Sequence, residues 1–282
     1  MSLSVAVFAH NEEHHIARCL YSVLADAGPD AAVHVLVNGS RDGTARVARE
    51  VAKADGRVRV HEITKGDKCN AWNVFVHDIR DQADVYAFVD GDVRVASGAL
   101  PILIGALADP TLNAAAAVPF SGRSAEANTA EMLRHPGVAG NLYALPARFV
   151  ERIRAQGIRL PVGLVGDDSL VGSLAGVDLG RLEAWDYARI KVCPRAGFEF
   201  DSLDVSNPRH FRQYWRRLVR YSVRRFENMM IRVVLEEVGP AGLPATAREL
   251  HRAHFAACQV GWRGDKTLFD LIAYRRIRNS LQ

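Results

Sequence analysis

The sequence has little of what marks secreted or membrane proteins. Its four cysteines among 282 residues are widely separated, and no two show the Cys-x-x-Cys spacing of a redox or zinc motif. We therefore expect no disulfide framework and a cytoplasmic protein. The longest apolar stretch, residues 95–108, is shorter than the roughly 20 residues that a membrane span needs. The N-terminus leads directly into a strand pattern rather than a signal peptide.

Three nucleotide-binding signatures are missing. No Gly-x-Gly-x-x-Gly follows the first strand pattern, which disfavours a dinucleotide-dependent oxidoreductase. No Gly-x-x-x-x-Gly-Lys-Ser/Thr occurs, which disfavours a P-loop enzyme. Residues 10–13 (His-Asn-Glu-Glu) also lack the glycine-rich basic loop that a sugar-nucleotide-forming nucleotidyltransferase usually needs at this point.

Charge is unevenly distributed along the chain. The formal net charge is +4. Residues 205–282 contain 15 Lys and Arg and 6 Asp and Glu, whereas residues 1–204 contain 21 Lys and Arg and 26 Asp and Glu. A basic C-terminal third suits an anionic partner such as a membrane surface or a lipid-linked phosphate. A well-solvated basic helix surface explains it equally well. No recognised nucleic-acid-binding module is present, so we expect no nucleic-acid partner.

Apolar strand patterns alternate with helical patterns along the first half of the chain, which indicates parallel βαβ units. Residues 120–135 are polar without a clear period, and we expect a mobile loop there. The strand patterns cover residues 3–9, 33–37, 58–63, 85–89, 112–118 and 138–145, and the helical patterns cover residues 16–24, 44–54, 65–77, 99–108, 208–232, 245–258 and 266–278.

The most informative stretch is residues 85–92, Val-Tyr-Ala-Phe-Val-Asp-Gly-Asp. Its apolar run predicts a strand buried on both faces, ending in Asp90 and Asp92. Ligands of open α/β sheets bind where parallel strands end. Two neighbouring carboxylates suit Mg²⁺ or Mn²⁺ shared with substrate phosphates, and Gly91 permits a tight turn beside the ligand. An isolated pair of this kind is also compatible with a solvated acidic turn.

Four motifs occur in a characteristic order: Asn11-Glu12-Glu13, residues 38–44 (Asn-Gly-Ser-Arg-Asp-Gly-Thr), residues 68–73 (Lys-Cys-Asn-Ala-Trp-Asn) and Asp90-Gly91-Asp92. In this order they resemble family 2 glycosyltransferases of the GT-A fold. The resemblance implies an α/β nucleotide-binding domain over residues 1–204, with a mainly parallel central sheet flanked by helices. Residues 205–282 would form a basic helical extension packed on that domain.

The resemblance also assigns donor-side roles. A nucleoside-diphosphate sugar would be held at its nucleoside by the turn at residues 9–12 and by Asn38, and at its diphosphate by Lys68 and Mg²⁺ or Mn²⁺. Phe200 stands where many relatives have a metal-binding histidine, so Asp201 is a candidate replacement. Asn38 replaces a frequent aspartate, which leaves a UDP-sugar and a GDP-sugar both open. The donor-side residues are Ala9, His10, Asn11, Glu12, Asn38, Lys68, Asp90 and Gly91, and the metal ligands are Asp92, Asp90 and Asp201.

On the acceptor side, the resemblance makes Asp168 the general base and Asp167 its supporting group. Without the upstream motifs, helix capping would be the favoured explanation of two acids at a helix start, with no chemistry involved. The motif containing Gly140 and Asn141 resembles the acceptor-side strand of the family, and Gln213 and Arg216 belong to a faint Gln-x-x-Arg motif on the arginine-rich helix. These four residues are expected near the acceptor.

The implied function is metal-dependent, inverting transfer of a sugar to a hydroxyl of a glycan, a lipid-linked acceptor or a small molecule. The alternative is a catalytically inactive subunit of the same fold that binds nucleotide sugars or a membrane, because several motif positions depart from the family. The basic C-terminal helices suggest peripheral contact with the inner face of the membrane. A core-covering helix and a homodimer contact are the alternative interpretations of the last helix, and both are more common.

Overall fold

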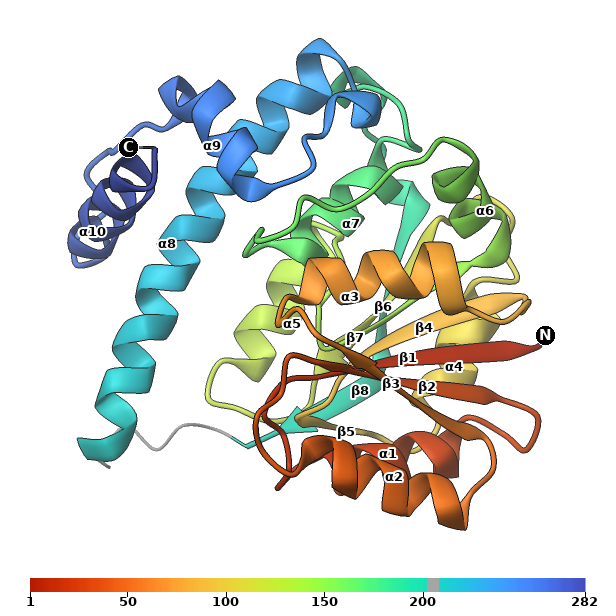
Figure 1. Ribbon diagram of the computed structural model, residues 1–282. Coiled ribbons are helices and arrows are strands. Elements are labelled where there is room, and N and C mark those ends of the chain that lie inside the picture. Colours follow the sequence, from red (N-terminus) through yellow and green to blue (C-terminus); the bar gives the residue numbers. More distant parts are fainter. Residues whose placement is uncertain (202–207, 282) are drawn as a thin grey trace.

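The computed structural model describes residues 1–201 and 208–281, and for residues 208–211 it describes the backbone alone. The predicted boundary between residues 204 and 205 lies outside the described residues. One eight-stranded sheet, with strand order β3-β2-β1-β4-β7-β6-β8-β5, forms the centre of the molecule (Figure 1). Its strands are β1 (Leu3–Ala9), β2 (Ala32–Asn38), β3 (Val58–Ile63), β4 (Val85–Asp90), β5 (Val93–Val95), β6 (Ala114–Pro119), β7 (Leu142–Pro146) and β8 (Ile190–Phe200).

The first four strands in the spatial order are parallel, as the alternating sequence pattern predicts. The register pairs Phe8 of β1 with Leu36 of β2 and with Asp90 of β4. The carboxyl ends of these strands therefore lie at one edge of the sheet, where the loops that follow them meet. All seven residues of β1 are buried, as its unbroken apolar run predicts.

The other half of the sheet is mixed. Strand β7 runs antiparallel to both β4 and β6, β8 runs parallel to β6, and β5 pairs antiparallel with β8. Sequence analysis missed β5, because three residues directly after an acidic turn carry no usable period. Because β7 runs antiparallel to β4, the residues that directly precede β7 lie beside the end of β4. There the Asp90 amide donates to the Asn141 carbonyl over 3.1 Å.

Helices cover both faces of the sheet. In Figure 1, α3 lies on one side of the sheet and α1 and α2 lie on the other, while α8, α9 and α10 stand together beside the sheet. Buried side chains form two clusters, one on each face. The helices are α1 (Ile16–Asp26), α2 (Thr44–Ala54), α3 (Lys68–Val74), α4 (Ala99–Ala106), α5 (Ala125–Arg134), α6 (Ala147–Ala155), α7 (Asp167–Gly176), α8 (Pro208–Glu237), α9 (Ala247–His254) and α10 (Lys266–Asn279).

Stacked aromatic side chains fill the core beneath α3. The rings of Phe88 and Tyr143 stack with centroids 4.8 Å apart, and Trp72 stacks on Phe88 at 5.9 Å. The indole N–H of Trp72 donates to the Tyr143 hydroxyl over 3.0 Å, so both buried polar groups are satisfied. Trp72 is fully buried and packs in this core.

Three expectations about local structure need correction. Residues 120–135 are not a loop throughout, because α5 occupies Ala125–Arg134. None of its residues is buried, which explains why the apolar period that marks a helix is absent. The region expected as one helix over residues 245–258 contains the shorter α9 and a 3₁₀ turn at Phe255–Ala257. The long basic helix α8 continues to Glu237, five residues beyond the predicted end.

Cysteine placement agrees with the expected absence of disulfides. All four cysteines carry free, buried thiols. No helix in the described part of the chain combines the length and apolar character that crossing a bilayer requires.

Two histidines on neighbouring strands form a polar cluster at the sheet. The side chain of His34 on β2 is 1% exposed, and its Nδ1 lies 3.0 Å from Nε2 of His61 on β3. Its Nε2 lies 3.2 Å from the carboxylate of Asp81, which also pairs with Arg59. Burial lowers the pKa of His34 below its usual 6.5, although Asp81 opposes the shift. Burial also lowers the pKa of His61.

Because the folded state holds these imidazoles neutral, stability depends on pH below neutrality. The unfolded chain takes up protons near pH 6.5 before the folded chain does, so stability falls as pH decreases from 7.5 to 5.5. We expect the melting temperature to fall less in His34→Gln than in the parent over this range. Each ~1 kcal/mol corresponds to about 2–4 °C in domains approaching this size. The control is His14→Gln, at a side chain 83% exposed, which should follow the parent. Identical pH profiles for all three proteins would contradict the assignment.

Candidate active site

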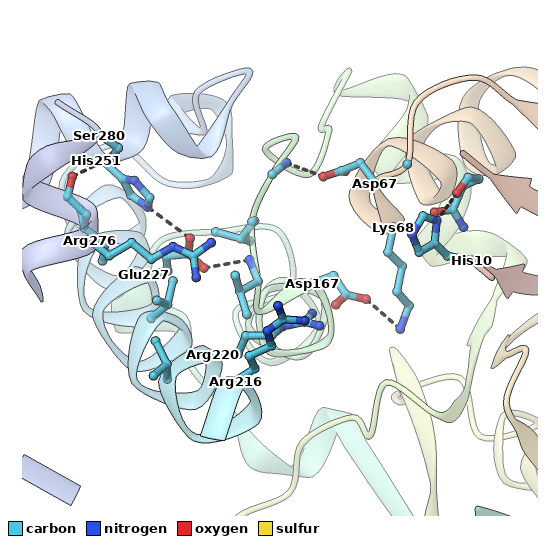
Figure 2. Close-up of a pocket in the computed structure, with 18 of the residues that line it drawn as sticks. His10, Asp67, Lys68, Asp167, Arg216, Arg220, Glu227, His251, Arg276 and Ser280 are labelled. Carbon is cyan, nitrogen blue, oxygen red and sulfur yellow. Dashed lines mark hydrogen bonds and ion pairs between the residues drawn. The ribbon is translucent and has the colours of Figure 1, made fainter. Parts of the chain in front are cut away.

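A cavity of ≈ 980 Å³ lies between the carboxyl ends of the parallel strands and the C-terminal helices. This volume is at the upper end of the ~300–1,000 Å³ typical of ligand pockets. Figure 2 shows side chains reaching into it from both walls. The lining residues are His10, Glu12, Asn38, Gly66, Asp67, Lys68, Gly163, Leu164, Val165, Asp167, Trp215, Arg216, Val219, Arg220, Val223, Glu227, His251, Arg276, Ile277 and Ser280.

The predicted nucleoside turn is held by hydrogen bonds to the loop after β2. Asn38 is buried, and its side-chain amide donates to the Ala9 carbonyl over 3.0 Å. The ring of His10 lies 2.6 Å from the Asn38 carbonyl. Asn11 adopts a left-handed conformation with φ 57°, which Asn tolerates better than most residues. The Glu12 amide donates to the hydroxyl of Thr44 over 2.7 Å, which connects the turn to the first residue of α2.

Two glycines allow the Asn38 loop to approach the loop that precedes α3. Gly39 has φ +61°, and a Cβ there would lie 2.5 Å from the Gly66 backbone. A side chain at Gly39 would therefore separate the two loops, whereas a Cβ at Gly66 would press on the His10 ring, 3.2 Å away. The next residue, Asp67, caps α3 by accepting from the Asn70 amide over 2.7 Å. Its second oxygen accepts from the Gly163 amide over 2.8 Å, which ties the loop after α6 to the same site.

Lys68 joins the donor-side and acceptor-side acids. Its ammonium lies 2.6 Å from Asp90 Oδ1 and 3.1 Å from Asp167 Oδ2, and it donates to the Gly140 carbonyl over 3.2 Å. Burial lowers the pKa of Lys68, but Asp167 and Asp90 outweigh this effect and raise the pKa well above its usual range. Lys68 is therefore a permanent positive charge between two acidic segments. Figure 2 shows its side chain extending toward Asp167.

Negative charge accumulates at the end of β4. Burial raises the pKa of Asp90 to about 7, and Asp92 raises it further against the opposing effect of Lys68. Burial likewise raises the pKa of Glu12, with Asp92 contributing. These carboxylates therefore disfavour one another's ionisation, and a divalent cation would relieve the repulsion. The oxygen donors present suit Mg²⁺ or Mn²⁺. Gly91 permits the turn between the two aspartates, because its amide donates to the Phe8 carbonyl over 2.8 Å and a Cβ would lie 2.9 Å from that oxygen.

Asp201 is not brought into a three-carboxylate cluster with Asp90 and Asp92. Across residues 1–201 and 208–281, no three His, Cys, Asp or Glu side chains are grouped closely enough to hold a metal ion. The Asp201 carboxylate instead lies 3.1 Å from Arg18 on α1 and 3.5 Å from His15, which directly precedes that helix. His15 also contacts Glu12 at 2.8 Å.

The acid pair opens α7, and its two members have different surroundings. Asp167 lines the cavity beside Lys68, and burial raises the pKa of its carboxyl group. Asp168 Oδ1 lies 2.9 Å from the Arg224 guanidinium, and its Oδ2 accepts from the Gly140 amide over 3.1 Å. The N-cap of α7 is Gly166, and both acids lie in the first turn, where Asp168 Oδ1 also accepts from the Ser169 amide over 2.9 Å. Stabilisation of the helix N-terminus is therefore one structural role of the pair, beside its contacts with Lys68 and Arg224.

The predicted acceptor-side residues fall into two groups. Gly140 touches both Lys68 and Asp168 through its backbone, and a Cβ there would lie 3.0 Å from the Asp168 carboxylate. The Asn141 amide lies 3.5 Å from Asp90. Arg216 lines the cavity from α8, whereas Gln213 is exposed and is not among the lining residues.

Sequence analysis missed the residues of α8 that hold the acid-bearing segment in place. Arg224 binds Asp168 and also donates to the Ser169 hydroxyl over 2.6 Å. One helical turn further on, Glu227 accepts from the Val165 amide over 2.8 Å and contacts His251 of α9 at 3.1 Å. The available signal was a pair of opposite charges three residues apart on the helix, but nothing in the sequence indicated its partners.

Comparisons with known proteins agree with this geometry. A model of the family described as "Glycosyl transferase family 2" matches residues 4–162. Protein RfbJ of Shigella flexneri is 29% identical over 106 residues, which are 38% of this chain and 76% of RfbJ.

Solved structures show the same fold at low sequence identity. The mannosyltransferase PcManGT from Pyrobaculum calidifontis, solved with GDP-Man and Mn²⁺, matches with TM-score 0.65 and 20% identity over 99% of this chain and 82% of its own. S. aureus TarS 1-349 matches with TM-score 0.54 and 14% identity over 99% of this chain and 91% of its own. Glucosyl-3-phosphoglycerate synthase from Mycobacterium tuberculosis, solved with Mn²⁺, UDP-glucose and phosphoglyceric acid, matches with TM-score 0.50 and 19% identity over 73% of each chain. The predicted GT-A architecture is thereby confirmed.

The contacts between α8 and the acid-bearing segment contribute to the stability of the protein. Glu227 is 1% exposed, so Glu227→Ala leaves the Val165 amide and His251 without their buried partner. We expect a loss of about 1–3 kcal/mol in the free energy of unfolding, measured by urea denaturation. The matched control is Glu236→Ala on the exposed face of the same helix, which should change stability by less than about 0.5 kcal/mol. Equal losses in the two variants would refute this role of Glu227.

Proposed function

The chain belongs to glycosyl transferase family 2, and from that premise we propose that it transfers a sugar from a nucleoside diphosphate to an acceptor hydroxyl with inversion at the anomeric carbon. The observation that carries this proposal is the bridge made by Lys68. It places the end of β4, where the donor diphosphate is expected, next to the acid pair at the start of α7, where a proton must be removed.

The donor would lie along the sheet-side wall of the cavity. Ala9, His10, Asn11 and Glu12 would surround the nucleoside together with Asn38, whose amide is already oriented by the Ala9 carbonyl. A uracil or guanine ring is compatible with an amide side chain, which both donates and accepts hydrogen bonds. Lys68 and Gly91 would lie beside the diphosphate. PcManGT binds GDP-Man, and the mycobacterial synthase binds UDP-glucose, so both donor classes belong in the first test.

Asp92 and Asp90 would hold Mg²⁺ or Mn²⁺, with the remaining ligands supplied by diphosphate oxygens and water. When bound, the ion supplies Lewis-acid stabilisation of the departing diphosphate. PcManGT and the mycobacterial synthase were solved with Mn²⁺, which supports the choice of metal. Asp201 is the weaker candidate ligand, because its carboxylate already pairs with Arg18.

The chain's own residues would perform the rest of the reaction. The acceptor oxygen attacks the anomeric carbon from the face opposite the diphosphate, and the bond to the diphosphate oxygen breaks as the new bond forms. Lys68 stabilises the charge that develops on the leaving group. Asp168 takes the proton of the acceptor hydroxyl, while Asp167 contacts the acceptor from the cavity wall. Gly140 fixes Asp168 and Lys68 relative to each other through its backbone.

Donor binding gives the first test. We expect UDP or GDP to raise the melting temperature only when Mn²⁺ or Mg²⁺ is present, since a ligand at 100 times its Kd adds about 2.7 kcal/mol of stability. Asp92→Asn should abolish the metal-dependent increase. Asp30→Asn, at an exposed position away from the site, is the matched control and should retain it. If no nucleoside diphosphate stabilises the parent protein with any added metal, the proposed function is wrong.

The two acids of α7 give the second test. We expect Asp168→Asn to reduce sugar transfer by about 10²–10⁴-fold while nucleoside-diphosphate affinity stays within about twofold. Asp167→Asn should keep more of the activity, because Asp167 only supports the acceptor. Calorimetric titration separates binding from turnover, and melting temperatures check folding, because Asp168 also anchors Arg224. The reverse ranking of the two variants would move the base to Asp167, whose carboxyl group has the raised pKa.

A further inference from the structure

The helical wall of the cavity carries positive charge without matching negative charge. Arg216 and Arg220 of α8 and Arg276 of α10 line it. Within the part of the chain that the structure describes, no carboxylate pairs with any of these three arginines. Neighbouring arginines differ, because Arg224 pairs with Asp168 and Arg225 pairs with Asp270.

These arginines share one surface. Arg216 and Arg220 are four residues apart on α8, so their side chains leave the same helix face. Figure 2 shows both directed toward the part of the cavity that contains Asp167, with Lys68 on the other side of that acid. Arg276 reaches the same cavity from α10. Like charges held near one another repel, and an anion between them removes that cost.

Apolar side chains lie beside the three arginines, which are themselves exposed to solvent. Val219 and Val223 lie on the same face of α8 and are 6% and 7% exposed, and Ile277 of α10 is 2% exposed. The one acid that α8, α9 and α10 contribute to the described cavity wall is Glu227, which is already bound to His251 and the Val165 amide. Arginine binds phosphate strongly through paired N–H groups, and the apolar side chains beside these arginines suit an apolar portion of the same ligand.

We propose that this helical wall binds a phosphate group of the sugar acceptor, so that the substrate accepting the sugar is a phosphorylated hydroxyl compound with an apolar portion. The inference rests on the proposed function and adds the class of acceptor. The donor diphosphate already has Lys68 and the acids of β4 on the opposite wall. A phosphate at Arg216, Arg220 and Arg276 places the rest of the acceptor next to Asp167 and Asp168.

The test separates acceptor binding from donor binding. Calorimetry measures the affinity of n-octyl phosphate, inorganic phosphate and octanoate below micelle-forming concentrations, and separately that of UDP and GDP with Mn²⁺. The double variant Arg220→Gln/Arg276→Gln removes two cavity charges. The matched control is Arg217→Gln/Arg278→Gln, which removes two exposed arginines of the same helices that do not line the cavity.

We expect the cavity variant to bind n-octyl phosphate at least ~10-fold more weakly than the parent, since charge-assisted hydrogen bonds are each worth about tenfold or more. Nucleoside-diphosphate affinity should stay within about twofold, and the control should match the parent for every ligand. Octanoate should bind more weakly than n-octyl phosphate. Tighter binding of n-octyl phosphate than of inorganic phosphate supports the apolar portion of the acceptor, and equal binding of the two would contradict it.

Two results would overturn the inference. One is an equal loss of nucleoside-diphosphate affinity in the cavity variant, which would assign the arginines to the donor. The other is phosphate binding that is absent from the parent or unchanged in the variant. Failure of the proposed function gives a different result, in which the parent binds no nucleoside diphosphate with Mn²⁺ while n-octyl phosphate still binds at the arginines.

Discussion

The contact between Lys68 and the carboxylates of Asp90 and Asp167 is the interaction on which the site depends. It joins the last residue of a parallel strand to the first turn of a helix that comes 77 residues later in the chain. Without this cation, the acids of β4 and α7 would face each other across a partly buried space, and the energetic cost of several unpaired charges there is high. The same ammonium can contact a diphosphate, so the group that balances the resting site also suits the chemistry of the reaction.

Much of this arrangement could be predicted from local patterns. The apolar runs of β1, β2 and β4 and the acids at the end of β4 carry their own signals, and so does the acid pair that opens α7. The exceptions have physical causes. β5 is three residues long, and α5 buries none of its residues, so neither has the periodicity from which secondary structure is predicted. The contacts of Arg224 and Glu227 depend on how α8 crosses the domain, and a single sequence does not encode that geometry locally.

The C-terminal helices form one wall of the cavity as well as packing beside the domain. Arg224 and Glu227 hold the acid-bearing segment at two points, and Val219, Val223 and Ile277 form the apolar part of the wall. The division into residues 1–204 and 205–282 remains a prediction. The contacts of α8 nevertheless show why the two parts have to be considered together in any account of the site. The basic charge of the C-terminal third is also partly explained, because several of its arginines bind acids within the protein.

The length of α8 has a geometric consequence. Thirty residues of continuous helix make a rod about 45 Å long. Two of the cavity arginines, Arg216 and Arg220, lie on this rod one to three turns from Arg224 and Glu227, which hold the acid-bearing segment. One unbroken helix therefore carries both the basic wall of the cavity and the anchors of the acid pair.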